Sequence, residues 1–498
     1  MSVSSIGAQS QMIMQQLVQM RSQFDDLQRQ LSTGQKSATY AGLGVDRGVT
    51  VSLNSQLSAL SSFNDTIQNV MARTNIMQTV LGNMTDITTT VKSAMVQANG
   101  VSDGSGAAIA QQTAQSSLDQ LLALLNSQSG DRYLFSGRAT DQPAVETLDH
   151  ILNGDGSKAG LKQLITERNQ ADLGIDGLGR LTISSAGSTV QVDEQATTFG
   201  LKLASITTTS GNATVSGPTG SPASMSVNFT GVPAPGDTVT MRFNLPDGTS
   251  SNVTLTATTE SPPGANQFTI GANANQTAAN FQTALTSVIG TLGATALTAA
   301  SAVAASSDFF NADANNPPQR VNGSSPFYAA TGLVPGTTAN TVIWYTGETG
   351  ADPARSTATA RIDTSLTVNY GARANEDAIR NLVQNVATLA AVNISPTDPN
   401  GVALSSALDQ RLTTNLGAPG QQTIADIESD IAGAQTAMQA ATKRHQQTSA
   451  SLSDFLQQID GVSNEQVGAE LLTLQTRMQA SLQVTSMLSQ ISLVNYIK

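Results

Sequence analysis

The sequence predicts an α+β fold in which long N- and C-terminal helices pair in an antiparallel coiled-coil bundle around a β-rich middle. Near both ends, apolar residues recur in alternating steps of three and four, the heptad pattern of helices that pack side by side. From about residue 180 to 350 the chain is rich in Thr, Ser, Gly, Pro and Asn and alternates in twos between turn signals. Because the two ends share one pattern, we expect them to pair with each other.

The first predicted helix carries a heptad seam that ends at a Gly-containing loop, STGQKSATYAGLGVDRGVT (32–50). A second helix repeats the pattern from Phe63 to Met95, and a third does so from Ala114 to Leu125. The seam residues of the first helix are Ile6, Ile13, Leu17, Met20, Phe24, Leu27 and Leu31.

The C-terminal part shows the same pattern from Ile424 to Val462, interrupted by DGVSN (460–464) and followed by a last helix. An exposed apolar stripe of this length would aggregate, so another part of the chain or another copy must cover it. We expect the last helix to meet the first and the two to form an assembly interface. The residues predicted for the last helix are Leu474, Met478, Leu482, Leu488 and Ile491.

The middle is predicted to hold short antiparallel strands in SMSVNFTGV, DTVTMRFNLPDG, SNVTLTATT and NQFTIGA, with one helix in TAANFQTALTSVIGTLG. A strand and then a helix are expected in DTSLTVNYGARANEDAIRNLVQNVATLAAV. The predicted organisation is an N-terminal inner helix (1–45), a helical rod (46–145 and 373–462), a β-rich outer region (146–190 and 318–372), an inserted β-rich domain (191–317) and a C-terminal inner helix (463–498).

Composition excludes several classes of function. Charged residues make up only 12% of the 498 residues, and the net charge of −12 is spread thinly, which argues against a nucleic-acid partner. The chain has no Cys, so disulfides and thiolate metal sites are ruled out. The N-terminus lacks the features of a cleaved signal peptide, and no stretch has the roughly 18 uninterrupted apolar residues of a membrane span. We therefore expect no membrane anchoring, and secretion by a route without a cleaved signal.

No set of residues points to catalysis, a cofactor or a metal. Of the two histidines, His445 falls on a heptad core position and is expected to be a hydrogen-bonded core residue, while His150 lies beside a turn. The acidic stretch DHILNGDGSKAG (149–160) lacks the ligand spacing of a calcium loop and is interpreted as an Asx-rich turn. The protein is therefore not expected to be an enzyme.

Three stretches resemble the flagellin superfamily of bacterial flagellar axial proteins. LQRQLSTGQK (27–36) is similar to the family's helix end and turn, and QASLQVTSMLSQISLVNYI (479–497) to its closing helix. GDRYLFSGRATDQPAV (130–145) resembles a turn of the members at the hook–filament junction. The residues that carry this turn motif are Arg132, Tyr133, Leu134, Phe135, Ser136 and Gly137, with Pro143 after them.

The resemblance implies a secreted structural subunit of the extracellular flagellum, exported by the flagellar type III system and assembled through its terminal helices at the hook–filament junction. Expected partners are further copies, flagellin, other hook-associated proteins and an export chaperone. Two alternatives stay open. The first is a filament-forming flagellin, because SATYAGLGVDRG (37–48) departs from the family's usual loop and the middle of the chain is long. The second is a secreted adhesin that binds its ligand through the β-rich middle.

Overall fold

The structure, a computed structural model, describes residues 3–99, 105–395, 397–417 and 420–494. The chain forms two compact units. We call the first the terminal unit, which comprises Met1–Met71, Ala360–Val368 and Gln435–Lys498, and the second the central unit, which comprises Ala72–Thr359 and Asn369–Ala434. Long helices near both ends and a β-rich middle confirm the predicted α+β class. The finer division into six segments remains a prediction.

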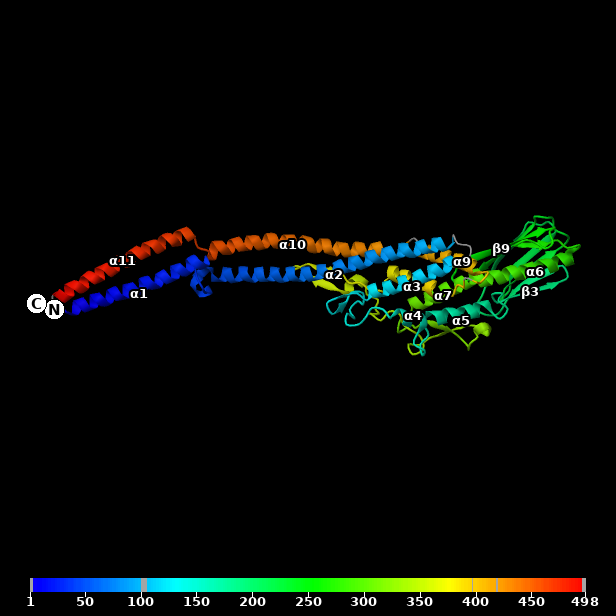
Figure 1. The fold of residues 1–498 in the computed structure, drawn as a ribbon, viewed down its shortest axis with the longest axis horizontal. Helices are drawn as coiled ribbons and strands as arrows, with labels where there is room; N and C mark the ends of the chain where they lie inside the picture. Colours follow the sequence, from blue (N-terminus) through cyan, green and yellow to red (C-terminus); the bar gives the residue numbers. More distant parts are fainter. Residues whose placement is uncertain (1–2, 100–104, 396, 418–419, 495–498) are drawn as a thin grey trace. The chain divides into compact units, whose positions relative to one another are not determined.

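In the terminal unit, helix α1 (Val3–Thr33) lies beside helix α11 (Asn464–Val494) (Figure 1). A β-bridge joins Gln35, just after α1, to Gly461, just before α11, so the two helices run antiparallel. The 3₁₀ helix η1 (Tyr40–Asp46) leads into α2 (Arg47–Asn99), and α10 (Ile424–Asp460) precedes α11. These bounds place the breaks at the Gly-containing loops that the sequence predicts.

Within the terminal unit, α10 packs on α2 through predicted heptad positions. His445 of α10 is buried; its Nδ1 lies 3.0 Å from Asn64 Oδ1 and its ring 5.9 Å from the Phe63 ring. Asp363, from the loop after β13 (Thr359–Arg361) and before β14 (Thr367–Asn369), lies 3.5 Å from His445 Nε2 and 3.4 Å from Arg444. The histidine is thus a core residue with polar neighbours, as expected.

The central unit is built on a helical core. Its part of α2 packs with α3 (Ser105–Leu125), α8 (Asp377–Ala391), α9 (Gly401–Asn415) and the first residues of α10. The Gln78 side chain of α2 donates to the Glu428 carbonyl of α10 over 2.8 Å. The buried seam residues of α2 in this unit match the predicted period of alternating three and four: Thr74, Met77, Leu81, Met84, Val91 and Met95.

Around this core lie α4 (Leu148–Asn153), α5 (Leu161–Leu173) and short elements: β1 (Gln128–Ser129), β2 (Arg132–Tyr133), β11 (Gln319–Val321), η3 (Phe327–Ala329), β12 (Leu333–Pro335) and η4 (Ala354–Thr357). Trp344 is buried and donates to the Phe310 carbonyl over 2.9 Å, which attaches the irregular segment to the core.

The β-rich middle forms two four-stranded sheets. One has the order β3-β4-β7-β6 and the other β10-β9-β8-β5. Side chains alternate along the strands, between buried and half-buried in β7, because one face of each sheet is packed in the core. The strands are β3 (Leu181–Ala186), β4 (Thr189–Glu194), β5 (Lys202–Thr208), β6 (Ala213–Thr219), β7 (Ser224–Phe229), β8 (Thr238–Asn244), β9 (Ser250–Thr258) and β10 (Gln267–Thr269).

One predicted pairing is wrong. The strand in NQFTIGA, β10, runs parallel to β9 and not antiparallel, with Gln267 opposite Thr256 and Thr269 opposite Thr258. The physical reason is the connection between the two strands. Residues 259–266 do not form a tight hairpin; they carry the chain back, so that β10 runs beside β9 in the same direction.

Helix α6 (Ala274–Leu292) is longer than predicted. It continues through a π-helical segment, η2 (Gly293–Leu297), into α7 (Thr298–Asn311), because the Ala-rich sequence after Gly293 favours helix. Phe281 of α6 joins the two sheets, with its ring 5.5 Å from Phe229 of β7 and 5.2 Å from Phe268 of β10.

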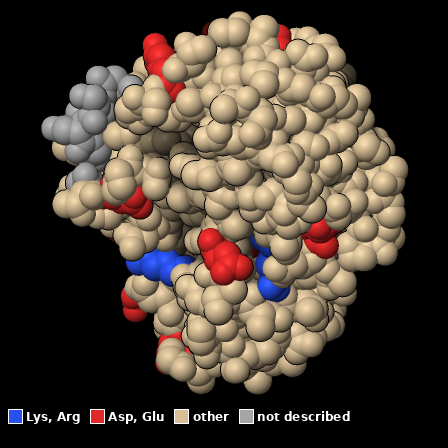
Figure 2. Space-filling model, turned by 90° about the vertical axis from the view of Figure 1, so that its right-hand side faces the viewer, with Lys and Arg blue, Asp and Glu red and all other residues tan. Residues whose placement is uncertain are grey.

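By length and composition, Ala274–Asn311 is the described helix that could cross a membrane, but 61% of its most apolar window is buried. Here α6 packs in the core of the β-rich region, and most buried residues of α7 pack in the helical core. Figure 2 shows the face at the end where α6 and the sheets lie in Figure 1. Few charged side chains are visible on this face.

Candidate assembly surface

Helices α1 and α11 share a seam that contains most of the predicted interface residues. On α1, Ile13, Leu17, Met20, Phe24 and Leu27 are half-buried. On α11, Leu474 is buried and Met478 half-buried. The remaining predicted residues differ: Leu31 and Leu482 are exposed, and the side chains of Ile6, Leu488 and Ile491 lie outside the part that the structure describes.

A second set of apolar side chains on these two helices points to solvent. We call Met12, Met14, Val18, Leu472, Val484 and Met487 the outer apolar residues. Val18 is 69% exposed and Leu472 64% exposed, and Met14 and Val18, four residues apart, lie on one stripe of α1. Two helices can bury only the faces they turn to each other, so these residues are left uncovered in the part of the chain that the structure describes. A helix face of this kind is typical of a binding surface for another protein.

The sequence prediction missed Val18, Leu472 and Val484 as surface residues. These residues lie next to heptad positions, so a search for heptad positions alone misses them. The signal that could have found them is the excess of apolar residues beyond the two per heptad that a coiled-coil seam needs.

The turn after α1 is joined to the turn before α11 by three hydrogen bonds, which we call the clasp. Lys36 N donates to the Asp460 carbonyl over 2.8 Å, and Val462 N to the Gly34 carbonyl over 3.1 Å. The Lys36 ammonium donates to the Ile459 carbonyl over 2.7 Å. Gly34 ends α1 with a φ of +71°, a left-handed conformation that glycine adopts without strain.

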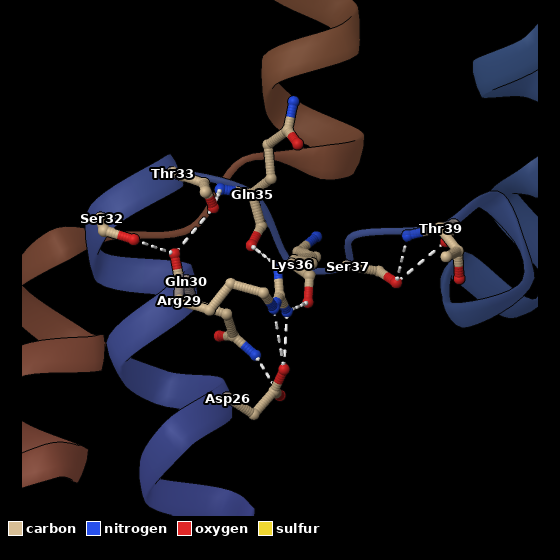
Figure 3. Close-up of polar contacts among 9 residues, drawn as sticks. All are labelled: Asp26, Arg29, Gln30, Ser32, Thr33, Gln35, Lys36, Ser37 and Thr39. Atoms are coloured by element: carbon tan, nitrogen blue, oxygen red, sulfur yellow. Dashed lines mark hydrogen bonds and ion pairs between the residues drawn. The ribbon is translucent and has the colours of Figure 1, made fainter.

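Arg29 holds the α1 side of the clasp in place (Figure 3). Its guanidinium donates to Asp26 Oδ1 over 2.7 Å and to the Lys36 carbonyl over 3.0 Å. Gln30 donates to the other Asp26 oxygen over 2.9 Å. The hydrogen bond from Arg29, followed by that from Gln30, holds the pKa of Asp26 below its usual range. Arg29 therefore bridges the last turn of α1 and the backbone that enters the clasp.

Apolar side chains are also exposed after the clasp. Segment η1 buries none of its residues, and Val45 is 96% exposed. Tyr40, Val49 and Val51 are exposed nearby. An ordered turn with no core of its own is a second candidate contact surface next to the helix pair.

The turn motif lies in the central unit, at the junction of β1–β2 and the segment before α8. Leu134, Phe135 and Ser136 are buried, Tyr133 is half-buried and Arg132 is exposed. Phe135 packs in the helical core, as the alternation of Tyr133 and Phe135 suggests, although the strand itself is only Arg132–Tyr133.

Backbone hydrogen bonds fix this motif to residues more than 200 positions away. Ala374 N donates to the Phe135 carbonyl over 2.8 Å, and Glu348 N to the Ser136 carbonyl over 2.9 Å. Gly137 has a φ of +65°, and a Cβ there would lie 2.6 Å from a Glu348 carboxylate oxygen. The motif thus needs glycine at this position for both conformation and space.

Residues 3–140 match the family model of the bacterial flagellin N-terminal helical region. This match supports the flagellin superfamily. Comparison with curated proteins gave no match. The matched flagellin region spans α1, η1, α2 and α3, and it ends just after the turn motif. It therefore includes Gly34 and Lys36 of the clasp and the outer apolar residues of α1.

The flagellin match supports a structural subunit of the bacterial flagellum, a component of the motility organelle that associates with copies of itself or with other axial proteins. The flagellin family is structural and not enzymatic. Among the residues that the structure describes, no group of three or more His, Asp or Glu side chains is placed to hold a metal ion.

Proposed function

We propose that this protein is a subunit of the hook–filament junction, similar to hook-associated protein 3, that is exported by the flagellar type III system and docks through α1 and α11. The flagellin N-terminal match and the Arg132–Gly137 motif support the family setting. The observation that carries the docking role is the set of outer apolar residues, which the α1–α11 pair leaves uncovered.

The physical driving force is burial of these side chains against neighbouring subunits. At roughly 25 cal/mol per Å² of apolar surface, a few hundred Å² per contact contributes several kcal/mol before ordering costs. A contact between two different surfaces that does not close on itself repeats along a helix, which is the geometry of a tubular polymer.

Point variants of the outer apolar residues test the docking role without breaking the seam. Val18→Asp and Leu472→Asp should abolish incorporation onto hooks while the subunit is still secreted into the medium, as measured by immunoblotting of sheared flagella and of supernatant. Gln19→Asp, at an exposed neighbouring position, adds the same charge; it is the control and should assemble normally. Normal assembly of both Asp variants would refute docking through this surface.

Deletion of 479–498 tests the contribution of the last helix. We expect secretion without incorporation, because α1 then loses much of its partner. Retention of normal assembly by the truncated chain would contradict the proposal.

Copy number separates the junction role from the alternative of a filament flagellin. A junction subunit is present as one short ring per flagellum, whereas a filament subunit accumulates in thousands. Quantitative mass spectrometry of sheared filaments, with hook protein as the internal standard, should give a ratio to hook protein well below one. A large excess over hook protein would assign the chain to the filament.

An export chaperone is the partner expected for the uncovered helices before assembly, since exposed apolar helices associate without control. Affinity capture of the full chain from the cytoplasm should recover one small partner whose binding is lost on deletion of 479–498. Unchanged capture by the truncated chain would place the chaperone elsewhere.

A further inference from the structure

A polar cleft in the central unit has features of a ligand site that assembly does not use. It has a volume of about 720 Å³ and is lined from α5, α7 and α8 and the strands β11 and β12. Ligand sites commonly occupy about 300–1,000 Å³. Its lining contains none of the outer apolar residues, the clasp residues or the residues of the turn motif.

An unsatisfied buried amide lines this cleft. Asn385 of α8 is 2% exposed; its Nδ2 donates to the Asn381 carbonyl over 2.7 Å, but its Oδ1 accepts no hydrogen bond. A buried carbonyl oxygen without a donor costs about 1–3 kcal/mol, so such groups are uncommon in folded proteins. A ligand that donates a hydrogen bond would remove this cost.

Its neighbour Gln384 is also in the lining and is 8% exposed. Among the described residues, nothing is hydrogen-bonded to its side-chain amide. Asn311 of α7 lines the same cleft and uses only its Nδ2, which donates to the Ser307 carbonyl over 2.7 Å. The cleft therefore presents amide groups whose hydrogen-bonding capacity is not fully used.

Asp308 and Arg168 are among the charged groups that line the cleft. Asp308 accepts from Gln319 N over 2.6 Å through Oδ2, which leaves its other oxygen for a ligand. Burial raises the pKa of Asp308, and the hydrogen bond from Gln319 N and then the positive charge of Arg168 oppose that shift. Arg168 is itself paired with Asp172 at 2.8 Å. The lining also includes Arg380 and three further carboxylates, each in an ion pair with an arginine: Glu167, Asp247 and Asp377. The lining therefore carries no excess positive charge, which disfavours phosphate and other polyanions.

We propose that this cleft binds a neutral sugar. Each sugar hydroxyl both donates and accepts, which matches the amides of Gln384, Asn385 and Asn311 and the carboxylate of Asp308. The C–H face of a pyranose ring needs a small apolar surface, and Val303 and Leu333 in the lining provide one. An extended peptide fits less well, because its affinity comes from pairing with an exposed strand edge or from side-chain pockets.

The test uses the full-length monomer, so its result does not depend on flagellar assembly. Glucose, galactose, mannose and N-acetylglucosamine are examined singly by saturation-transfer NMR and titration calorimetry, with tetraglycine as the peptide probe. We expect at least one sugar to bind, and Gln384→Ala and Asn311→Ala each to weaken it at least tenfold. Asn311 is exposed, so this variant keeps the test valid if Gln384→Ala does not fold.

Gln112→Ala is the matched control, because Gln112 is an exposed amide on α3 outside the cleft, and it should bind the sugar with unchanged affinity. Absence of binding by all four sugars, equal binding by both cleft variants, or binding of tetraglycine alone would each overturn the proposal.

Discussion

The Lys36 ammonium donates a hydrogen bond to the Ile459 carbonyl over 2.7 Å, although 423 residues separate the two in the sequence. Ile459 lies in the last turn of α10, where carbonyl groups have no partner within the helix and the helix dipole favours a positive charge. The bond therefore adds charge-assisted stabilisation to a clasp that is otherwise made of backbone hydrogen bonds.

Lys36→Met should loosen the clasp without unfolding α1. The loss of one hydrogen bond from an exposed charged group costs about 0.5–1.5 kcal/mol. Hydrogen exchange should become faster at Lys36 N and Val462 N, the two amides of the clasp. Gln35→Met, the adjacent exposed position, is the control, and equal acceleration in both variants would exclude a specific role for the ammonium.

Asp363→Asn should lower the stability of the terminal unit at neutral pH but not at strongly acidic pH. Hydrogen bonds from the Thr364 backbone, Arg444 and His445 hold the pKa of Asp363 below its usual range. A carboxyl group with a lowered folded-state pKa stabilises above its unfolded pKa and loses this effect as pH falls through the folded value.

Thermal unfolding followed by circular dichroism checks this dependence. The difference in Tm between wild type and Asp363→Asn should be greatest above about pH 5 and should vanish as pH falls through the lowered folded-state pKa of Asp363. Asp454→Asn, at an exposed position of α10, should show no comparable difference. A Tm difference independent of pH would contradict the electrostatic explanation.

Gly137→Ala should destabilise the central unit more than Gly130→Ala. Both glycines have positive φ values, +65° and +62°, so alanine costs about 1–2 kcal/mol of backbone strain at either position. Only at Gly137 does the new Cβ also meet Glu348, at 2.6 Å, whereas nothing lies within 4 Å at Gly130. Urea unfolding measures the free energy of unfolding of both variants. Equal losses of stability would show that the Glu348 side chain moves away without cost.

Arg411→Leu should free the β8–β9 turn from α9. Arg411 donates to Asp247 over 2.7 Å, and the Asp247 side chain is almost fully buried. Removal of one partner leaves a buried charge and costs about 3–5 kcal/mol. The double variant Arg411→Leu/Asp247→Leu should regain much of this loss in urea unfolding, and a double variant no more stable than the single one would assign the effect to lost packing.

The helices at both ends could be predicted from the sequence, because heptad spacing indicates directly which side of a helix is buried. The seam from Thr74 to Met95 and the core position of His445 follow from that period. The short strands of the middle follow from their period of two, but the parallel direction of β10 does not, since alternation is the same in either direction.

The candidate sites were harder to predict. Whether Val18 or Leu17 faces solvent depends on how α1 and α11 rotate against each other, which a single-helix pattern does not specify. The clasp and the polar cleft join segments far apart in the sequence: Lys36 is hydrogen-bonded to Ile459, and Asp308 and Gln384 line one cavity. Their residues are ordinary amides, carboxylates and amines, and no local spacing marks them.

The long separation in sequence between Lys36 and Ile459 also determines the order in which the paired helices become available. Helix α1 is synthesised first, but its partner α11 is released from the ribosome, or from any channel that carries the chain, only after α2 through α10. Closing so long a loop is slow compared with forming a local helix. For that interval the apolar side of α1 is open, and the first molecule able to cover it competes with the protein's own last helix.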